Sequence, residues 1–417
     1  MKFRKFAVSF ASLLALSVTA AENEGGQIET VDSSPVAEGG DFIRRITIDE
    51  HHWSYVHVFT NASAVQTFKN TSGWPMEVRY LVVGGGGAGG NTGRNSYGGG
   101  GGGGGGVAEV ENVPFAEGSS WSIFVGRGAT EQSTQAAGSA ISNGVSQICA
   151  VPGGGSGGHG TSSSDYVPPI AGAAGGGAAV LGTTTSQGAD GTFASFVLNM
   201  TPPEDGYSGG KSYSYPGGGG GGAGAAGGDA TKGDGLLCAG NGGEGLVSDI
   251  TGEPFVYGSG GGGGCINGSS NKGPGGVGGT NAGSGGGRDV ATGKSLAPTA
   301  PVPNSGAGGG GGSGTEYFNG TTGADGIVVI RYDYCDYPCL GGDWVRVIPK
   351  SANKTTFIHA FTNVYGAASF SNRSGKDLKM RYLVVGGGGA GGSGSGNYPG
   401  GGGGGGGVAE ANRGVFA

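Results

Sequence analysis

The sequence contains one pattern that could bind a nucleotide. Residues 84–90 satisfy Gly-x-Gly-x-x-Gly directly after an apolar segment, and Glu109 lies near the distance expected of a ribose-binding acid. Nucleotide binding of this type also needs a helix after the glycines, because its N-terminus binds the pyrophosphate. Here residues 91–97 are polar and nine glycines follow at 98–106. The pattern therefore favours a strand running into a glycine segment.

The five cysteines could form disulfides. Cys335 and Cys339 could close a small loop in the connection after residue 334, and Cys238 with Cys265 could tie two loops together. Cys149 would then need a partner elsewhere. Free thiols or a different pairing are the alternatives, and zinc is disfavoured because a second ligand pair is missing.

No constellation of catalytic or metal-binding residues emerges. His51, His52 and His57 are close in sequence, but strand parity separates them, so a polar, partly exposed strand face is favoured over a metal site. Residues 227–235 resemble a calcium-binding turn but do not form a repeated nonapeptide. Neither a nucleophile elbow with a histidine partner nor a carboxylate pair stands out. We expect no enzyme activity, no cofactor and no metal.

Several tyrosines lie in or beside glycine-dominated stretches. Tyrosine combines a large rigid surface with a polar tip, which suits recognition of sugars or proteins. The alternative is that these side chains cap a glycine bundle and shield its backbone from water. The candidate ligand-contact residues are Tyr166, Tyr207, Tyr213, Tyr215, Tyr257 and Tyr317.

The elements that would position these residues are strands. Segments rich in β-branched and aromatic residues are bounded by Gly, Asn, Pro or Asp, and none after the N-terminal segment has a sustained helical period. The continuous apolar centre of 326–332 predicts a buried strand that pairs with 81–83. The other predicted strands are 42–48, 53–59, 76–83, 107–110 and 121–125.

Glycine accounts for 106 of the 417 residues and dominates 151–319. Such a composition without a Gly-X-Y period is typical of disorder, but aromatic and β-branched segments interrupt these runs. Because glycine lacks a Cβ, extended chains can approach at backbone distance, as they do in collagen. The sequence therefore predicts packed polyglycine-II helices cross-linked by N–H···O bonds and inserted into a β-sandwich.

One block of sequence occurs twice. Residues 79–90 recur unchanged as 381–392, and flanking segments also match. The repeat unit is about 300 residues, much longer than a solenoid period of roughly 20–50. We predict whole tandem domains: copy 1 at 41–334 and the start of a truncated copy 2 at 335–417.

The N-terminal residues have the features of an export signal. A basic start, an apolar stretch and small residues near Ala20 and Ala21 predict a signal peptide at 1–21, followed by a linker at 22–40. An uncleaved anchor is the alternative. No later segment is apolar enough to span a membrane. The net charge of −7 and the lack of a basic stripe exclude nucleic acid as an expected partner.

Taken together, these segments resemble the glycine-rich domain family. The resemblance rests on the strand into polyglycine at 79–90, the segment 121–129 and the closing strand at 326–332. The family is found in bacterial surface proteins and phage tail-fibre adhesins, with a relative in anaplastic-lymphoma-kinase-type receptors. The resemblance implies a β-sandwich that carries packed polyglycine helices and binds ligands through loops at their ends. It implies no shared catalytic residues.

The expected function is therefore that of an exported, non-enzymatic adhesin or surface-binding protein. Its partner would be a cell-surface glycan or protein, and self-association is also expected to occur. A purely structural envelope or matrix protein without a specific ligand is the alternative. Ice or mineral binding is disfavoured because regular triplets and a flat Thr-rich face are missing.

Overall fold

The computed structural model shows an all-β chain, and its described residues contain no helix. A helix that is long and apolar enough to cross a bilayer is therefore not found among these residues. The predicted signal peptide lies outside the described residues. The description covers residues 35–416 except 50–51, 74, 93–96, 161–165, 180–184, 194, 196–205, 234–235, 267–272, 315–317, 336–338, 352–353, 364, 373–377 and 395–399.

The described chain forms two compact units. The first runs to residue 333, apart from 48–52, and the second contains those five residues with 334–417. In the first unit, one five-stranded sheet has the order β2-β3-β16-β5-β6. These strands are Phe42–Asp49 (β2), His52–Phe59 (β3), Ile327–Cys335 (β16), Met76–Val83 (β5) and Val107–Phe115 (β6).

A second five-stranded sheet has the order β1-β4-β7-β8-β9. It includes β1, which pairs Ala37 with Asn70 and lies within the segment predicted to be a linker. Ala37 and Glu38 of the predicted linker at 22–40 therefore belong to a sheet, and residues 22–34 lie outside the described residues. The strands are Ala37–Glu38 (β1), Gln66–Asn70 (β4), Ser120–Phe124 (β7), Ser139–Ser142 (β8) and Gln147–Val151 (β9).

The closing strand β16 lies in the middle of its sheet. It runs antiparallel to β5, with Ile327 opposite Val83 and Val329 opposite Leu81, which confirms the pairing predicted from the sequence. All four residues from Ile327 to Ile330 are buried, because both faces of this sheet are covered. A strand buried on both faces needs a continuous apolar run and not an alternating one.

Aromatic side chains connect the two sheets on one face. Phe68 on β4 stacks on Phe115 of β6, with ring centroids 5.0 Å apart. Trp121 on β7 lies 4.4 Å from Phe115 and 6.2 Å from Tyr80 of β5, measured between centroids. Aromatic pairs at such distances contribute about 0.5–1.5 kcal/mol each beyond their burial. The two sheets therefore share an aromatic interior.

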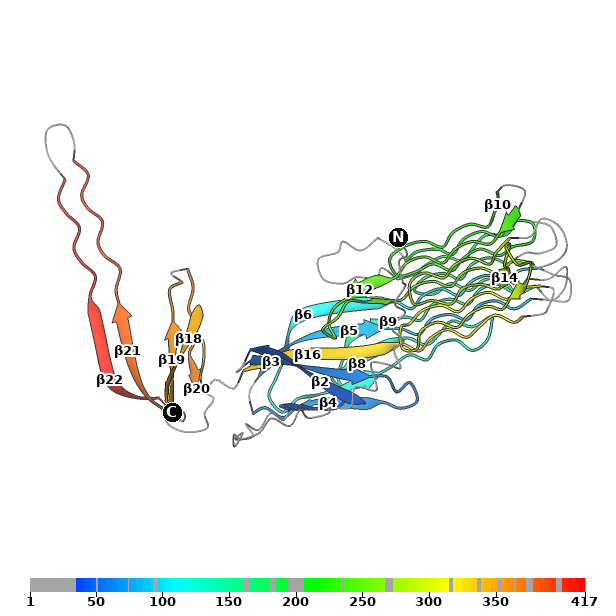
Figure 1. Cartoon of the computed structure of the whole chain (residues 1–417). Helices are drawn as coiled ribbons and strands as arrows, with labels where there is room; N and C mark the ends of the chain where they lie inside the picture. The colour runs from blue at the N-terminus through cyan, green and yellow to red at the C-terminus, as the bar shows by residue number, and fades with distance from the viewer. Residues whose placement is uncertain are drawn as a thin grey trace. The chain divides into compact units, whose positions relative to one another are not determined.

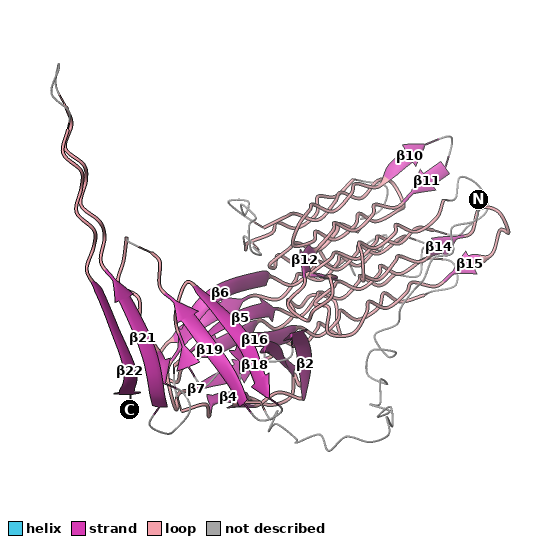
Figure 2. Cartoon of the chain, turned by 60° about the vertical axis from the view of Figure 1, so that its left-hand side comes forward, coloured by secondary structure: helices cyan, strands magenta, loops and turns pink. Residues whose placement is uncertain are grey.

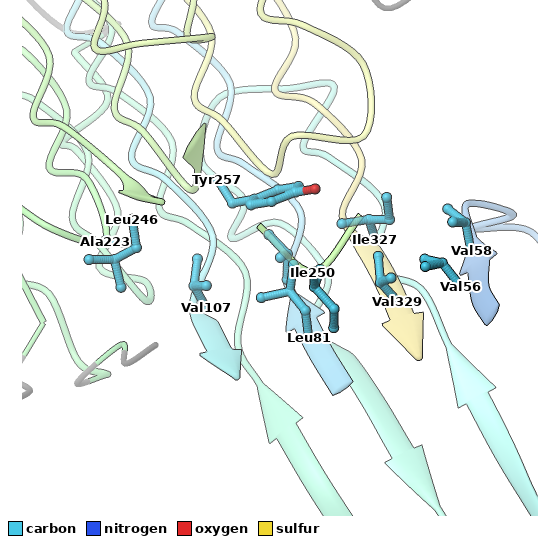
Figure 3. Packing of buried hydrophobic residues seen from close by; sticks show 11 residues of the cluster. Val56, Val58, Leu81, Val107, Ala223, Leu246, Ile250, Tyr257, Ile327 and Val329 are labelled. Atoms are coloured by element: carbon cyan, nitrogen blue, oxygen red, sulfur yellow. The ribbon is translucent and has the colours of Figure 1, made fainter. Parts of the chain in front are cut away.

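The other face of the β16 sheet packs against the glycine region. Its apolar side chains meet a hairpin formed by β12 (Leu246–Ser248) and β13 (Phe255–Tyr257). Figure 3 shows Tyr257 and Ile250 among the strand residues of this cluster, with Ile250 next to Leu81. The cluster joins the sheet to the base of the glycine segments. It comprises Val56, Val58, Leu81, Val83, Val107, Ala223, Leu246, Ile250, Tyr257, Ile327 and Val329.

Glycine segments run side by side away from the sheets (Figures 1 and 2). Two short hairpins lie at the end of these segments that is far from the sheets, which we call the distal end. They are β10 (Thr231–Gly233) with β11 (Leu236–Cys238), and β14 (Gly287–Arg288) with β15 (Ser295–Leu296). The segments are therefore anchored at one end by the sheets and closed at the other by turns.

The run 98–106 lies at the centre of this array and bonds only through its backbone. Every third N–H donates to the same neighbour, over N···O distances of 2.7–3.1 Å. The three acceptor segments are 215–221, 306–312 and 152–158. The carbonyls of the run accept from three further segments, which are 84–90, 174–177 and 261–264. Six neighbouring segments satisfy the backbone groups that glycine side chains cannot.

This packing explains the nine consecutive glycines. An ideal Cβ placed on any residue from 98 to 105 would lie only 1.9–2.2 Å from a carbonyl oxygen of a neighbouring segment. Ordinary non-bonded contacts are much longer, near 3.5–4.0 Å. The array therefore requires glycine because of the close approach of neighbouring backbones.

The second unit consists of paired strands with exposed apolar faces. Tyr382, Leu383, Val384 and Val385 are 48–63% exposed, whereas Tyr80 and Leu81–Val83 are 0–4% exposed. The sheets of this unit have two strands each. The pairs are Cys339–Leu340 (β17) with Ser371–Asn372 (β20), Trp344–Ser351 (β18) with Lys354–Ala360 (β19), and Leu378–Val385 (β21) with Val408–Phe416 (β22).

Candidate functional site at the distal end of the glycine region

A pair of stacked tyrosines lies at the distal end. Tyr97 immediately precedes the central run and Tyr215 accepts a hydrogen bond from the N–H of Gly98. Their ring centroids are 5.5 Å apart and their planes differ by 8°. Both rings are partly exposed, and Tyr213 in the adjoining turn is 41% exposed. We call Tyr97, Tyr213 and Tyr215 the distal tyrosines.

A small apolar cluster supports the distal tyrosines. Leu237, Ala239 and Cys265 are buried there, and Tyr215 packs against them together with Ile266. The Cys265 Sγ–H donates to the carbonyl of Leu237 over 3.1 Å. Burial raises the pKa of the Cys265 thiol to about 11. This thiol is therefore protonated at neutral pH and serves as packing for the aromatic pair.

Not all predicted contact tyrosines reach this site. Tyr213 and Tyr215 do, and Tyr166 is half-buried beside the isolated bridge between His159 and Val167. The carbonyl of Tyr207 accepts from Gly175, at a level of the array closer to the sheets.

Tyr257 is only 1% exposed and belongs to the core, so the expectation that it contacts a ligand is wrong. The sequence analysis singled out Tyr257 for its place beside the glycine segments, but it did not predict that Tyr257 is the last residue of the short strand β13 at the base of the array. Tyr317 lies outside the described residues.

The cysteines do not form a site at the distal tyrosines. Cys339 is a buried free thiol, whereas the side chain of Cys335 lies outside the described residues. The bridge between them stays a prediction. Cys149, Cys238 and Cys265 are also free thiols in this structure. Among the described residues, no group of three or more potential ligands is placed to hold a metal ion.

His57 is a structural residue in the sheet. It is fully buried, which corrects the expectation of a partly exposed strand face. Its Nδ1 lies 2.7 Å from the carbonyl oxygen of Gly39, so we assign the proton to Nδ1. Gly39 has a φ of +117°, and a Cβ there would lie 2.0 Å from the oxygen of Thr67. Burial lowers the pKa of His57, which favours the neutral ring.

An ion-pair network missed in the sequence fixes the base of the array. Arg79 donates from Nε to Glu109 over 2.6 Å and from Nη2 to Asp249 over 2.6 Å. The Glu109 side chain is 1% exposed. Burial raises the pKa of Glu109 and the Arg79 guanidinium opposes that shift. In the structure Glu109 pairs with Arg79, so its spacing from the glycines in the sequence does not indicate ribose binding.

The sequence did contain a signal for this ion pair, because both of its residues recur in the second block. Arg381 and Glu410 occupy the matching positions of the second block and also form an ion pair, with an N···O distance of 2.5 Å. Their side chains are 73% and 40% exposed. Solvent therefore screens the second pair much more strongly than the first.

The comparison with protein families agrees with this architecture. The glycine-rich domain family matches residues 62–333, which is more than half of the chain. The chain therefore belongs to the glycine-rich domain family. No curated protein matches it.

Proposed function

We propose that this chain is an exported, non-enzymatic adhesin or surface-binding protein that contacts a cell-surface glycan or protein through its distal loops. The observation that carries this proposal is the position of the distal tyrosines. Tyr97 and Tyr215 form a flat, partly exposed pair at the end of an array whose interior is backbone. A pre-organised aromatic surface binds sugars and proteins with little loss of side-chain entropy.

The scaffold in this proposal is a β-sandwich that carries polyglycine-II helices. The three-residue hydrogen-bond spacing of the run 98–106 supports the helices, because polyproline-II-like chains have three residues per turn. The aromatic contacts between the two five-stranded sheets support the sandwich. Six neighbours around one run would make the platform stiff, so the loops would keep their geometry when bound.

The proposed location rests on the N-terminal sequence and on the resemblance to surface proteins. Residues 1–21 have the composition of a cleaved signal, with cleavage near Ala20 or Ala21. The proposal of adhesion rests on the sequence resemblance to the glycine-rich domains of bacterial surface proteins and phage tail-fibre adhesins. A relationship to anaplastic-lymphoma-kinase-type receptors is proposed from the same sequence resemblance. The repeated sequence block supports a tandem array of such domains.

The test is saturable binding of the purified chain to intact cells and to immobilised glycans. Tyr213→Ala should weaken binding roughly 5–30-fold, the effect of about 1–2 kcal/mol at an aromatic contact. Tyr365→Ala is the matched control, because Tyr365 is 96% exposed and lies in the second unit. Equal binding by both variants would contradict the role of the distal tyrosines.

A structural role without a specific ligand is the second candidate. The exposed apolar strand residues of the second unit favour it, because large exposed apolar surfaces promote association. Concentration-dependent assembly in sedimentation experiments, together with no saturable binding to cells or glycans, would support the structural role over adhesion.

A further inference from the structure

Two cysteines lie together in the apolar cluster that supports Tyr215. Cys238 is the last residue of β11, and Cys265 directly follows the glycine-rich run 258–264. The Sγ of Cys265 lies 3.1 Å from the carbonyl oxygen of Leu237, the residue immediately before Cys238. Two residues that are distant in the sequence are therefore neighbours at the distal end.

Gly273 lies beside both sulfur atoms. A Cβ added to Gly273 would lie 3.2 Å from the Sγ of Cys238. Burial raises the pKa of Cys265, a backbone hydrogen bond from Gly273 opposes that rise, and the nearby Cys238 adds to it. The two thiols thus share one neighbour and interact with each other electrostatically.

The segments that carry the two cysteines run antiparallel in one register. The N–H of Gly260 donates to the carbonyl of Gly243 over 2.8 Å. Three residues further along, the N–H of Gly263 donates to the carbonyl of Gly240 over 2.9 Å. A step of three residues forward on one segment is therefore matched by three residues backward on the other.

This register places the two cysteines opposite each other. Cys265 lies two residues after Gly263, and Cys238 lies two residues before Gly240. Hydrogen-bonded neighbouring backbones lie about 5 Å apart. A disulfide usually joins Cα atoms about 4.4–6.8 Å apart. The two side chains can therefore be bridged without a large movement of either backbone.

We propose that Cys238 and Cys265 form a disulfide when the folded chain meets an oxidising disulfide, and that this bond ties β11 to the run 258–264 beneath the distal tyrosines. Both residues are thiols in the structure, and the sequence alone left this pairing open beside free thiols. The proposed export would bring the chain into a compartment where such oxidants are present. The bond itself does not depend on any bound ligand.

The reaction is a thiol–disulfide exchange in two steps. Cys238 is half-buried and Cys265 is fully buried, so the Cys238 thiolate attacks the oxidant first and one thiol leaves. Cys265 then loses its proton and attacks the Cys238 sulfur, which releases the second half of the oxidant as a thiol. The chain loses two hydrogen atoms, and the oxidant gains them. Because the pKa of Cys265 is raised, ring closure should accelerate about tenfold per pH unit between pH 7 and 9.

The test uses the full chain, first reduced and then exposed to oxidised glutathione at pH 8 without denaturant. Remaining thiols are blocked with N-ethylmaleimide, and the chain is cut after Glu244 without reduction. Glu244 lies between the two cysteines, so only a disulfide keeps the two fragments together. Mass spectrometry should find this linked pair with two hydrogen atoms missing. Cys238 joined to a different cysteine, unreacted, or held as a glutathione adduct even at pH 9 would overturn the proposal.

Two variants sharpen this test. Cys265→Ser should stop at the glutathione adduct of Cys238, whereas Cys149→Ser should form the bond like the wild type, because Cys149 lies on β9 in a sheet. An internal link from Cys238 in the Cys265→Ser chain would contradict the assigned pairing.

Stability provides a second measurement. Closing a loop of roughly 30 residues should raise the midpoint of urea unfolding of the wild-type chain by about 1 M after oxidation. The midpoint of Cys265→Ser should not rise after the same treatment. An unchanged or lower midpoint of the oxidised wild-type chain would refute the fit of this bond to the folded register.

Discussion

Gly103 and Gly404 occupy matching places in the two glycine runs, yet replacing each by alanine should affect stability differently. At Gly103, a Cβ would lie 2.2 Å from the carbonyl oxygen of Ala174. At Gly404, no heavy atom lies within 4 Å of the added Cβ. The same substitution therefore tests the packing of the glycine array separately from the properties of alanine.

The expected magnitude follows from the clash. A neighbouring segment must move by about 1.3–1.8 Å to restore an ordinary contact. Overpacking of this kind costs about 1–3 kcal/mol. Disturbing the Gly103 N–H bond to Gly155, now 2.7 Å, adds about 1 kcal/mol. Alanine also stabilises by about 0.4–1 kcal/mol through the unfolded chain. The net loss for Gly103→Ala is about 2–3 kcal/mol, and Gly404→Ala should be neutral or stabilising.

Urea unfolding followed by tryptophan fluorescence measures this difference. Trp53 and Trp121 are buried in the first unit and report its unfolding. With an m value of about 2–3 kcal/mol/M, Gly103→Ala should lower the midpoint by about 1 M. A midpoint within about 0.2 M of the wild type would refute the close-packed array, because the added methyl group would then have room.

Three further predictions follow from buried polar groups. Arg79→Ala should destabilise the first unit by about 3 kcal/mol in urea unfolding, because it leaves Glu109 buried without its cation. Arg381→Ala should change stability by less than about 0.5 kcal/mol, because its ion pair is exposed. Similar losses for the two variants would contradict this reasoning. Because the pKa of His57 is lowered in the folded state, the unfolded state takes up a proton first as the pH falls. The thermal midpoint should therefore decrease below a pH of about 6.5, and His57→Gln should flatten the plot of midpoint against pH between pH 8 and 5. An unchanged slope of that plot would exclude His57 as the cause. With a pKa of about 11, the Cys265 thiol should be alkylated at pH 8 roughly 100-fold more slowly than a free peptide thiol. Mass spectrometry of the labelled protein measures this rate. Rapid labelling would show that the apolar cluster around Cys265 opens.

The strand content and the central strand could be predicted from local sequence. The apolar run at 327–330 indicates burial on both faces, and its pairing with 81–83 is confirmed. The strands β8 and β9 were missed, because Ser139–Ser142 and Gln147–Val151 are short and contain small or polar residues. Tertiary pairing in the second sheet stabilises them despite their weak local preference.

The candidate site was predicted only in part because its geometry is non-local. Tyr213 and Tyr215 were singled out, but Tyr97 lies more than 100 residues earlier and joins them only through the folded array. The burial of Tyr257 likewise depends on the sheet beneath its hairpin. Glycine runs show where backbones approach, but they do not specify which of the segments become neighbours.

The three-residue period of the central run limits how the length of the array can change. Successive residues of 98–106 donate their N–H groups to three neighbouring segments in turn, so residues three apart donate to the same segment. Inserting one or two glycines would redirect every later N–H to a different neighbour, whereas inserting three would keep the directions. Lengthening also requires the paired segments to grow with it. The reach of the distal loops should therefore vary between related chains in steps of three residues, about 9 Å each for a polyproline-II-like rise.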